Sequence, residues 1–535
     1  MIFSLILTLL ATPFAQPAAM DIRQQEDLVQ RALRLVDSDQ VLEHFDTRSF
    51  IRDDPLVGGG VHSPVKCGTL LTSEIASNWA RLSKTTQASL SSLFQRQARQ
   101  ASFISRNDRF EVHYDTTGSH AVANFDDDGN GTPDYVDFVA NTFEDVWDLQ
   151  ILQLGYLEPP VDSDGRYDVY IKNLGNSGVY GLTWPDPGGT TTASYMEIDN
   201  NFTDNIYFTR GDKAVQVTAA HEFYHAIQFA YYAPFDVAWW QELTATWMED
   251  FAYDDVNDYY AYVKFFLEAP EESLDKFSFG NLRPFGASIF GHYLADVYGT
   301  ETIKSTWDSL GTRTPSSYDI VDIDSALPGG FSGVLPRFAI WNYFTGSRQR
   351  GYYQEGGVFE EVSVRTIQPS PGQSTADFKR VDHFGATYIR VETQGLSGGL
   401  RVTLDLDSDA TWGVVVLLVT ANTVDILRPS GSDVEIPNVG SYDEVVIIPM
   451  VLSSSGTNFT VDYSVLATTA VQGWSDLIGD FDHDGEVGFN DFLGFADSFG
   501  RSGAERHDER HDMDANGTID FSDFLKFAGR FGDKL

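Results

Sequence analysis

Two histidines and a glutamate lie close together in the stretch AAHEFYHAIQFAYY (219–232), and their spacing suits a metal site. His221 and His225 are four residues apart, so on a helix both imidazoles project from the same face. Two nitrogens at this spacing can share one tetrahedral zinc ion, and Glu222 can reach a water at that ion without being a ligand. The motif predicts hydrolytic zinc chemistry with Glu222 as general base. The alternative is two ordinary histidines on a helix.

A hydrolytic zinc site needs a third protein ligand and an open position for water. A third histidine in the arrangement HExxHxxGxxH would require glycine at 228 and histidine at 231, but the chain has Gln228 and Tyr231. That arrangement is therefore excluded. The stretch WWQELTATWMED (239–250) offers Glu242 and Glu249, which are seven residues apart and lie roughly on one helical face. The residues alone leave both acids open as the third ligand.

The C-terminal stretches DFDHDGEVGFND (480–491) and DMDANGTIDFSD (512–523) alternate oxygen-bearing side chains around a glycine. This pattern predicts calcium loops, because calcium binds about six to eight oxygens in a flexible shell. The candidate ligands are Asp480, Asp482, Asp484, Glu486 and Asp491 in the first loop and Asp512, Asp514, Asn516, Thr518 and Asp523 in the second, with backbone carbonyls at 486 and 518. The second copy repeats the phenylalanines of the first about 32 residues later: Phe489, Phe492, Phe495 and Phe499 correspond to Phe521, Phe524, Phe527 and Phe531. They are expected in the core of a small domain rather than in a partner-binding stripe.

A third acidic stretch, DDDGNGTPDYVD (126–137), fits the same scheme. Its candidate calcium ligands are Asp126, Asp128, Asn130, Asp134 and Asp137. Pro133 stands where the C-terminal loops have an aliphatic residue, which favours a different scaffold around similar ligands. Bound calcium would stabilise a chain that has no disulfide.

The chain has a single cysteine, Cys67, in the stretch PVKCGT upstream of the histidine motif. A thiolate is a good zinc ligand, so this residue could occupy the open position and hold an enzyme latent. The alternative is a small buried side chain in a helical segment, and the sequence favours this alternative.

Positioning these groups requires several domains, because 535 residues exceed one hydrophobic core. Short strands such as EVHYD, RYDVYIKN and ASYMEIDN precede helices from 211 to about 345, which predicts an α+β catalytic domain. A Pro/Gly/Ser stretch, TIQPSPGQST (366–375), predicts a linker before a run of apolar strands. The expected parts are a signal peptide (1–19), a helical N-terminal or pro-region (20–105), the catalytic domain (106–350), a β-sandwich accessory domain (372–468) and a small all-α paired calcium-loop domain (476–535).

The net charge of −42, from 78 acidic and 36 basic residues, excludes whole classes of partner. Such a surface repels nucleic acid and anionic lipid. The apolar start MIFSLILTLLATPFA is too short for a membrane anchor and suits export. No later stretch predicts a membrane span, so a secreted or cell-surface attached protein is expected.

HEFYH followed by WWQELTATWMED resembles the secreted bacterial gluzincin-like metallopeptidases, as do DDDGNGTPDYVD, DGRYDVYIKN and YMEIDN. The resemblance covers about 106–345. It implies a zincin-like fold and favours Glu242 as the third zinc ligand, because its E-x-x-A context is similar to that family's glutamate helix. Glu249 or Asp250 would then orient a histidine. The chain departs from the thermolysin-type pattern at Thr246, where that pattern has aspartate.

Residues 476–535 resemble a dockerin-type module, a pair of calcium loop-helix units that attaches enzymes to a partner at the cell surface. This resemblance implies a cohesin-like or cell-surface partner. The chain departs from it in the insert AERHDERH (504–511) between the units.

The expected function is that of an exported zinc endopeptidase acting on a protein or peptide substrate through a zinc-activated water. His292 and Tyr293 are candidates for stabilising the oxyanion, with core packing as the alternative for both. Other readings remain open. The chain could be a catalytically inactive, calcium-binding surface adhesion or scaffold protein, or a zinc hydrolase acting on something other than peptides.

Overall fold

The structure is a computed structural model that describes residues 18–35, 66–175, 177–312, 320–469, 473, 476–502 and 508–535. Residues 1–17, most of the predicted signal peptide, lie outside the described residues. Within the described ranges the chain is a mixed α/β protein with several sheets and helical layers. No helix in these ranges combines the length and apolar character needed to cross a bilayer.

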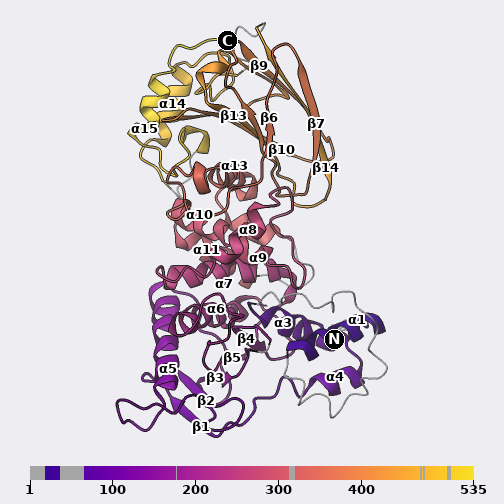
Figure 1. Ribbon diagram of the computed structural model, residues 1–535, viewed down its shortest axis with the longest axis vertical. Helices are drawn as coiled ribbons and strands as arrows, with labels where there is room; N and C mark the ends of the chain where they lie inside the picture. The colour runs from indigo at the N-terminus through magenta and orange to yellow at the C-terminus, as the bar shows by residue number, and fades with distance from the viewer. Residues whose placement is uncertain are drawn as a thin grey trace, which may run out of the picture.

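The first sheet lies at one end of the molecule (Figure 1). Its strands are β1 (Ala101–Ile104), β2 (Phe110–Tyr114), β3 (Tyr167–Lys172), β4 (Gly181–Pro185) and β5 (Ser194–Asp199), in the order β1-β2-β3-β5-β4. The pairings of β2 with β3 and of β3 with β5 are parallel, whereas β1 and β4 are antiparallel strands at the two edges. The sequence predicts β2, β3 and β5 but not the edge strands. The sheet also begins at residue 101 rather than after 106.

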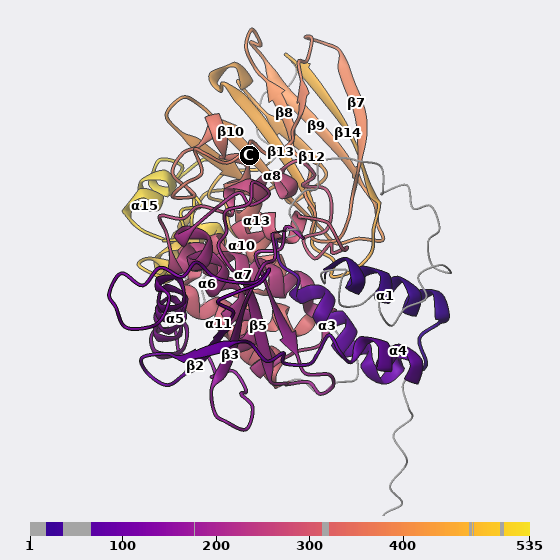
Figure 2. The ribbon, with the colours of Figure 1, turned by 60° about the horizontal axis from the view of Figure 1, so that its bottom comes forward.

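Helices cover both faces of this sheet. On one face α5 (Asp134–Trp147) and α6 (Asp212–Tyr231) share a core with β2, β3 and β5. On the other face the N-terminal helices α1 (Ile22–Leu35), α3 (Thr69–Asn78) and α4 (Lys84–Leu90) form a smaller apolar cluster with Tyr170, Leu182 and Tyr195. Figure 2 shows these N-terminal helices together beside the sheet. Alternate residues of the strands therefore supply two separate cores.

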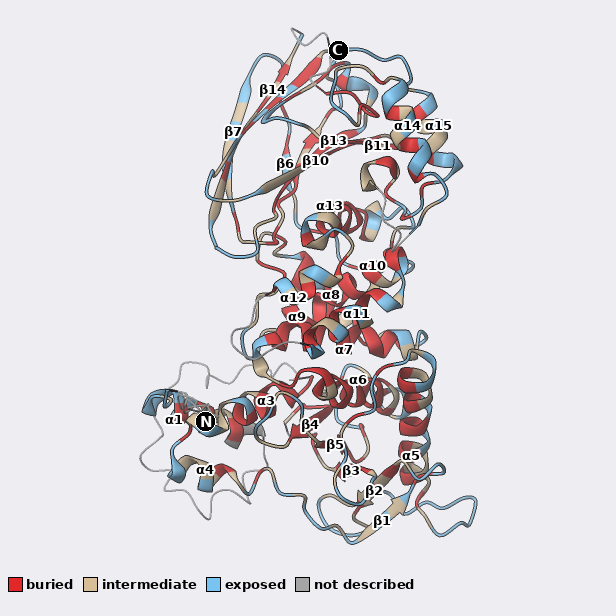
Figure 3. Cartoon of the chain, turned by 180° about the vertical axis from the view of Figure 1, so that it is seen from behind, coloured by how far each residue is buried: buried red, intermediate tan, exposed pale blue. Residues whose placement is uncertain are grey.

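A helical layer follows, between the first sheet and the rest of the chain (Figure 1). It contains α7 (Ala238–Ala252), α8 (Tyr260–Leu267), α9 (Arg283–Gly286), α10 (Ser288–Tyr298), α11 (Thr300–Gly311), α12 (Val321–Ala326) and α13 (Gly330–Tyr343). Helices α6 and α7 are buried on nearly every side (Figure 3). Their sequences are rich in alanine, aromatic and aliphatic residues all round, as a helix without a solvent face requires.

Short helical turns join the longer elements. A π-helix spans Asp148–Gln153, and 3₁₀ turns span Trp79–Arg81, Phe235–Val237, Gly346–Arg348, Val439–Ser441 and Glu509–His511.

A β-sandwich follows the helical layer. One sheet, ordered β11-β10-β13-β8-β6, faces a sheet ordered β12-β9-β14-β7. The strands are β6 (Arg365–Ile367), β7 (Ser374–Val381), β8 (Ile389–Glu392), β9 (Gly399–Leu406), β10 (Trp412–Val419), β11 (Val424–Leu427), β12 (Asp433–Ile436), β13 (Glu444–Val451) and β14 (Phe459–Thr468). The linker predicted over 366–375 is therefore wrong at both ends, because β6 pairs with β8 and β7 begins at Ser374.

The sandwich is continuous with the helical layer. Strand β13 is buried along its whole length, since one face packs inside the sandwich and the other packs against α13 and its neighbours. Tyr343 donates a hydrogen bond to Glu444 Oε1 at 2.7 Å, and the rings of Phe331 and Phe384 stack with centroids 4.4 Å apart. A pattern of continuous apolar strands already indicates burial on both faces.

The C-terminal residues form the helices α14 (Phe489–Ser498) and α15 (Phe521–Ala528), each preceded by an acidic loop. Phe495 and Phe527 stack in the core between them, with ring centroids 5.3 Å apart. The second loop packs on the helical layer, where Arg337 Nη2 lies 2.8 Å from Asp512 Oδ2 and Trp341 Nε1 donates to the Ala515 carbonyl at 2.9 Å. The tail is therefore docked on the rest of the chain.

Candidate metal centre

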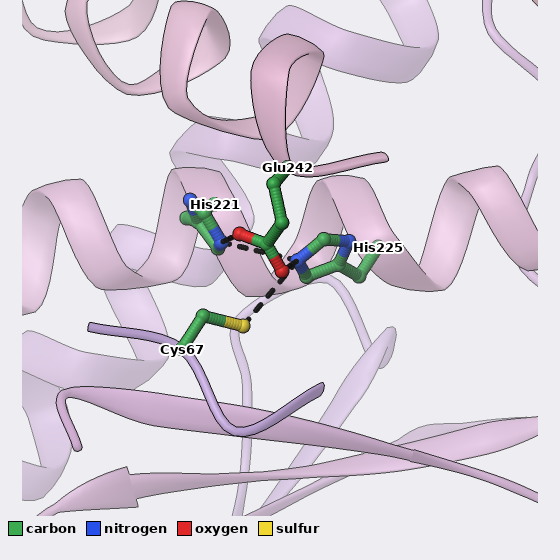
Figure 4. A group of neighbouring side chains, drawn as sticks. All are labelled: Cys67, His221, His225 and Glu242. Carbon is green, nitrogen blue, oxygen red and sulfur yellow. Dashed lines mark hydrogen bonds and ion pairs between the residues drawn. The ribbon is translucent and has the colours of Figure 1, made fainter. Parts of the chain in front are cut away.

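Four buried side chains from three segments converge on one point (Figure 4). His221 and His225 project from one face of α6, and their Nε2 atoms are 3.0 Å apart. Glu242 reaches in from α7, with Oε2 3.3 Å from Nε2 of His221 and Oε1 3.4 Å from Nε2 of His225. Cys67 approaches from the segment before α3, and its Sγ is 3.4 Å from Nε2 of His225.

The spacing of these donor atoms fits a tetrahedral zinc ion. Bonds of about 2.0–2.3 Å to nitrogen, oxygen and sulfur place neighbouring donors about 3.3–3.8 Å apart, and the measured distances are close to this range. Both carboxylate oxygens of Glu242 are buried and accept no hydrogen bond from the described residues. A buried carboxylate that accepts no hydrogen bond is costly, so a cation at this point would remove a penalty that the fold otherwise carries.

Hydrogen bonds on the far side of each imidazole fix its orientation. His221 Nδ1 lies 2.6 Å from Glu249 Oε1, and His225 Nδ1 lies 2.7 Å from Gln228 Oε1. The amide of Gln228 donates to the Gln241 carbonyl at 3.0 Å, which leaves Gln228 Oε1 as an acceptor for His225. Both histidines therefore carry the proton on Nδ1 and present the Nε2 lone pair to the centre, as metal-binding histidines do.

The electrostatics of the cluster favour a cation. Burial lowers the pKa of His221, but the neighbouring carboxylates of Glu242 and Glu249 outweigh burial and raise this pKa well above its ordinary value. Burial raises the pKa of Glu242, but the neighbouring histidines outweigh it and lower this pKa below its ordinary range. Burial, followed by the charges of Glu222 and Glu242, raises the pKa of the Cys67 thiol. Without a metal ion, protons on the imidazoles supply the positive charge that Glu242 requires.

The buried lysine beside the cluster pairs with other carboxylates. Lys66 is buried and pairs with Glu249 at 2.7 Å and with Asp258. Among the described residues, neither Glu222 nor Glu242 pairs with a lysine or arginine. Buried carboxylates persist when they are paired or bind a metal.

Glu222 lies beside the cluster and not in it. Its Oε2 accepts hydrogen bonds from the hydroxyls of Thr69 at 2.7 Å and Thr183 at 2.8 Å. A cavity of about 10 Å³ is lined by Lys66, Tyr180, Val217, Thr218, His221, Glu222 and Glu249. This volume is close to the minimum that one water needs. Glu222 and His221 both line this space, whereas His225 and Glu242 do not.

A glycine allows strand β4 to approach this helix. A Cβ atom at Gly181 would lie 2.7 Å from Thr218 Cγ2 and 2.8 Å from Glu222 Cγ. Any larger residue would therefore push β4 away from α6. Gly181 keeps the edge strand in contact with the candidate base.

The candidates for oxyanion stabilisation, His292 and Tyr293, contact residues outside the ligand cluster. The hydroxyl of Tyr293 donates to the Val334 carbonyl at 2.8 Å within the helical core. Burial lowers the pKa of His292 to about 3, and its Nδ1 is 3.7 Å from Asp250 Oδ2. Asp250 therefore contacts His292 and not a histidine of the cluster, so the role of orienting His221 belongs to Glu249.

Several site residues carry no sequence signal of their own. Thr183 lies on an edge strand that the pattern does not predict, and Gln228 is notable only for excluding a third-histidine arrangement. Lys66 and Thr69 flank Cys67 in PVKCGT, so the cysteine motif was the signal that could have found them. Thr246, at the position of departure from the thermolysin-type pattern, is buried and its hydroxyl has no partner among the described residues.

The C-terminal acidic loops have matching internal hydrogen bonds. In the first, the backbone N–H groups of Asp484 and Gly485 donate to Asp480, and Asp491 accepts from the N–H of Phe481 at 2.6 Å. In the second, Asn516 and Gly517 donate to Asp512, and Asp523 accepts from Met513 at 2.7 Å. Asp480, Asp482 and Asp491 gather in one group, and Asp512, Asp514 and Asp523 in another. Carboxylates this close require a cation such as calcium or partial protonation.

The remaining predicted ligands of these loops take part in the same turns. Asp484 Oδ1 accepts from the N–H of Glu486 at 3.0 Å, and Asn516 Oδ1 accepts from the N–H of Thr518 at 2.8 Å. The glycine after Asp484 and the one after Asn516 both have positive φ, 89° and 99°.

The loop at 126–137 has the same turn but closes it differently. Asn130 and Gly131 donate to Asp126 at 3.1 Å and 3.0 Å, as in the C-terminal loops. The backbone N–H of Asp127, the second residue of this loop, donates to Oδ1 of Asp134 at 3.0 Å. Asp126, Asp128 and Asp134 form the group of neighbouring oxygens, whereas Asp137 accepts from the Asn130 amide at 3.0 Å. The structure thus gives Asp134 the position that Asp491 and Asp523 have in the tail.

In comparisons with known proteins, neither a family model nor a curated protein matches the chain.

Proposed function

We propose that this chain is an exported zinc-dependent endopeptidase. One observation carries the proposal: two imidazole nitrogens and a buried carboxylate that accepts no hydrogen bond from the described residues point at one position beside a second carboxylate, that of Glu222. This combination supplies ligands for a metal ion and a base for water. A purely structural helix pair has no need for either.

The chain's own residues would perform most of the reaction. His221, His225 and Glu242 would hold the ion, while Glu249 and Gln228 keep the imidazoles in the required tautomer. Zinc, when bound there, supplies Lewis acidity that polarises the scissile carbonyl and acidifies water. The substrate would lie along β4, because the backbone of an extended peptide can pair with a sheet edge.

Glu222 would move the proton. Its carboxylate follows His221 directly on α6 and is not one of the grouped ligand atoms, so it would accept a proton from the attacking water and deliver it to the departing amine. The hydroxyl of Thr183, on the edge strand β4, donates to Oε2 of Glu222 and would keep this carboxylate oriented during the reaction. Removing this base should cost about 10²–10⁴-fold in rate.

Metal analysis together with casein zymography tests the proposal. The purified chain should contain about one zinc per molecule, lose casein cleavage in 1,10-phenanthroline and regain it on adding zinc. A chain that binds zinc but leaves casein intact, even when Cys67 is replaced by serine, would favour hydrolysis of another substrate. A chain with neither zinc nor cleavage would favour the adhesion or scaffold alternative.

A second candidate function concerns the C-terminal module, whose two halves expose the same side chains. Phe489 and Phe521 are 64% and 62% exposed, and Leu493 and Leu525 are 51% and 56% exposed. The expectation that the repeated phenylalanines form a core holds for Phe495 and Phe527 but is wrong for this outer set. The repetition supports a protein partner that binds through either half, such as a cohesin-like partner at the cell surface.

Retention at the producing cell's surface tests this second function. Replacing Phe489 and Phe521 by serine should move the chain from the envelope fraction into the medium. Phe378→Ser, which changes an exposed residue on β7, is the control. Equal retention of all three forms would argue against attachment through the module.

A further inference from the structure

The segment of residues 66–69 contacts the candidate zinc site at several points at once. Cys67 Sγ joins the two histidines and Glu242 in one group of potential ligand atoms, all within 4.8 Å of one another. Cys67 is buried, as are the histidines. The two oxygens of the buried Glu242 carboxylate point into the same group and accept no hydrogen bond from the described residues, which is independent evidence that a cation belongs there. With Cys67 included, the protein alone supplies a complete tetrahedral shell, and a catalytic zinc keeps one position open.

The same segment also holds the candidate base. The hydroxyl of Thr69 donates to Glu222 Oε2 at 2.7 Å and accepts from the N–H of Thr183 at 2.7 Å. Because Oε2 of Glu222 already accepts this hydrogen bond, it is less available to a water. Lys66 Nζ donates to Glu249, which in turn orients His221. Lys66 thus contacts the acid that orients His221, Cys67 lies at the metal position, and Thr69 contacts the candidate base.

The backbone of the segment occupies the edge of the sheet. The N–H of Gly68 donates to the Gly181 carbonyl at 3.2 Å, and the N–H of Tyr180 donates to the Lys66 carbonyl at 3.1 Å. Cys67 and Gly181 form a parallel bridge at the start of β4. A substrate strand that needs these backbone groups is excluded while the segment is in place. The segment leads into α3, whose Leu71 and Ile75 pack in the apolar cluster with Leu182 on the outer face of the sheet.

We propose that residues 66–69 are a built-in inhibitory segment, in which the Cys67 thiolate takes the fourth zinc position and the segment blocks both the base and the substrate edge. This inference rests on the proposed zinc peptidase function. It assigns Cys67 an inhibitory role, because a thiolate that saturates the shell leaves no position for water. Activity then requires the segment to leave the site.

X-ray absorption at the zinc edge of the intact wild-type chain tests the ligand directly. The expected shell has one sulfur and three nitrogen or oxygen donors. Cys67→Ser should keep the zinc in an all nitrogen and oxygen shell, and Cys67→Ala gives the same readout without a hydroxyl. Ser73→Ala is the matched control. Ser73 is a buried residue of α3 whose hydroxyl has no partner among the described residues, and its replacement should leave the sulfur in the shell.

Hydrolysis of a fluorogenic peptide tests the inhibition. Cys67→Ser should hydrolyse the peptide at least about tenfold faster than the intact wild type, while Ser73→Ala should match the wild type. Zinc bound in an all nitrogen and oxygen shell in the wild type would overturn the inhibitory segment and leave the peptidase proposal standing. A sulfur-containing shell with no gain in Cys67→Ser would make Cys67 a structural ligand and overturn its inhibitory role. A chain that binds no zinc would overturn both.

Discussion

Glu249 Oε1 lies 2.6 Å from Nδ1 of His221, on the side of the imidazole opposite the ligand cluster. Glu242, two helical turns earlier on α7, lies 3.3 Å from Nε2 of the same ring. The two acids on one face of α7 therefore have different roles around a single histidine. One lies beside the Nε2 atoms of both histidines, at the candidate ligand position, and the other fixes the proton on the far nitrogen.

Glu249→Gln should weaken zinc binding about 10–100-fold, because such outer hydrogen bonds orient the ligand and raise its basicity. The change also removes a charge that pairs with Lys66. Competition with a chromophoric chelator measures the affinity. Glu268→Gln, at an exposed position after α8, is the control. An unchanged affinity would mean that Glu249 has no part in orienting His221.

Glu222→Gln should retain zinc and lose about 10²–10⁴-fold in peptide cleavage, since the amide cannot accept the water's proton. Glutamine keeps the size of the side chain and can still accept from Thr183. Zinc content and cleavage should be measured on the same preparation. Glu301→Gln on the exposed side of α11 is the control. Cleavage at the wild-type rate with full zinc would exclude Glu222 as the base.

Chelation with EGTA should lower the melting temperature by several degrees, because an ion that binds the native state stabilises it. Asp512→Asn should lower it more than Asp480→Asn. Asp512 is fully buried and pairs with Arg337 of α13, so its loss leaves a buried guanidinium without this carboxylate.

Asp533→Asn, an exposed residue near the C-terminus, is the control for this pair. The measurement is differential scanning calorimetry with and without calcium. A melting temperature that does not respond to EGTA would contradict calcium binding by the loops.

Asp250→Asn should stabilise the protein at alkaline pH. Burial, followed by the charges of Glu355 and Asp254, raises the pKa of Asp250 to about 8. The native state therefore holds a proton that the unfolded state releases near pH 4, and stability falls as pH rises from about 4 to 8. Asparagine resembles the protonated acid and removes this loss, a gain of roughly 1–3 kcal/mol at pH 8.

The melting temperatures of Asp250→Asn and wild type should therefore agree near pH 4 and diverge toward pH 8. Asp405→Asn, at an exposed position on β9, is the control. A constant difference between pH 4 and pH 8 would show that Asp250 titrates at its ordinary pKa.

Features contained in a few consecutive residues could be predicted from the sequence. His221 and His225 share a face because one helical turn separates them, whatever α6 packs against. The C-terminal loops place their acids around Gly485 and Gly517 because the turn is fixed within twelve residues. The predicted inner strands of the first sheet also follow from local apolar patterns.

Edge strands and packing between parts were beyond such patterns. β4 contains a glycine and ends in a proline, so its propensity for strand is low, and it forms because it pairs with β5. The stretch read as a linker has turn residues, yet both of its ends pair in the sandwich. The docking of Asp512 on Arg337 depends on two segments 175 positions apart in the numbering, which no local pattern connects.

The sequence by itself determined which residue types could bind zinc and calcium, because ligand spacing within one turn is a property of the local backbone. Only the tertiary structure decided between Glu242 and Glu249, since both lie on one face of α7 and the crossing of α6 and α7 selects the acid that reaches Nε2. It also brought Cys67 to His225 across 158 residues and gave Asp134 the closing position in its loop. Contacts at that separation arise from the packing of whole elements, and composition and periodicity do not encode which elements meet.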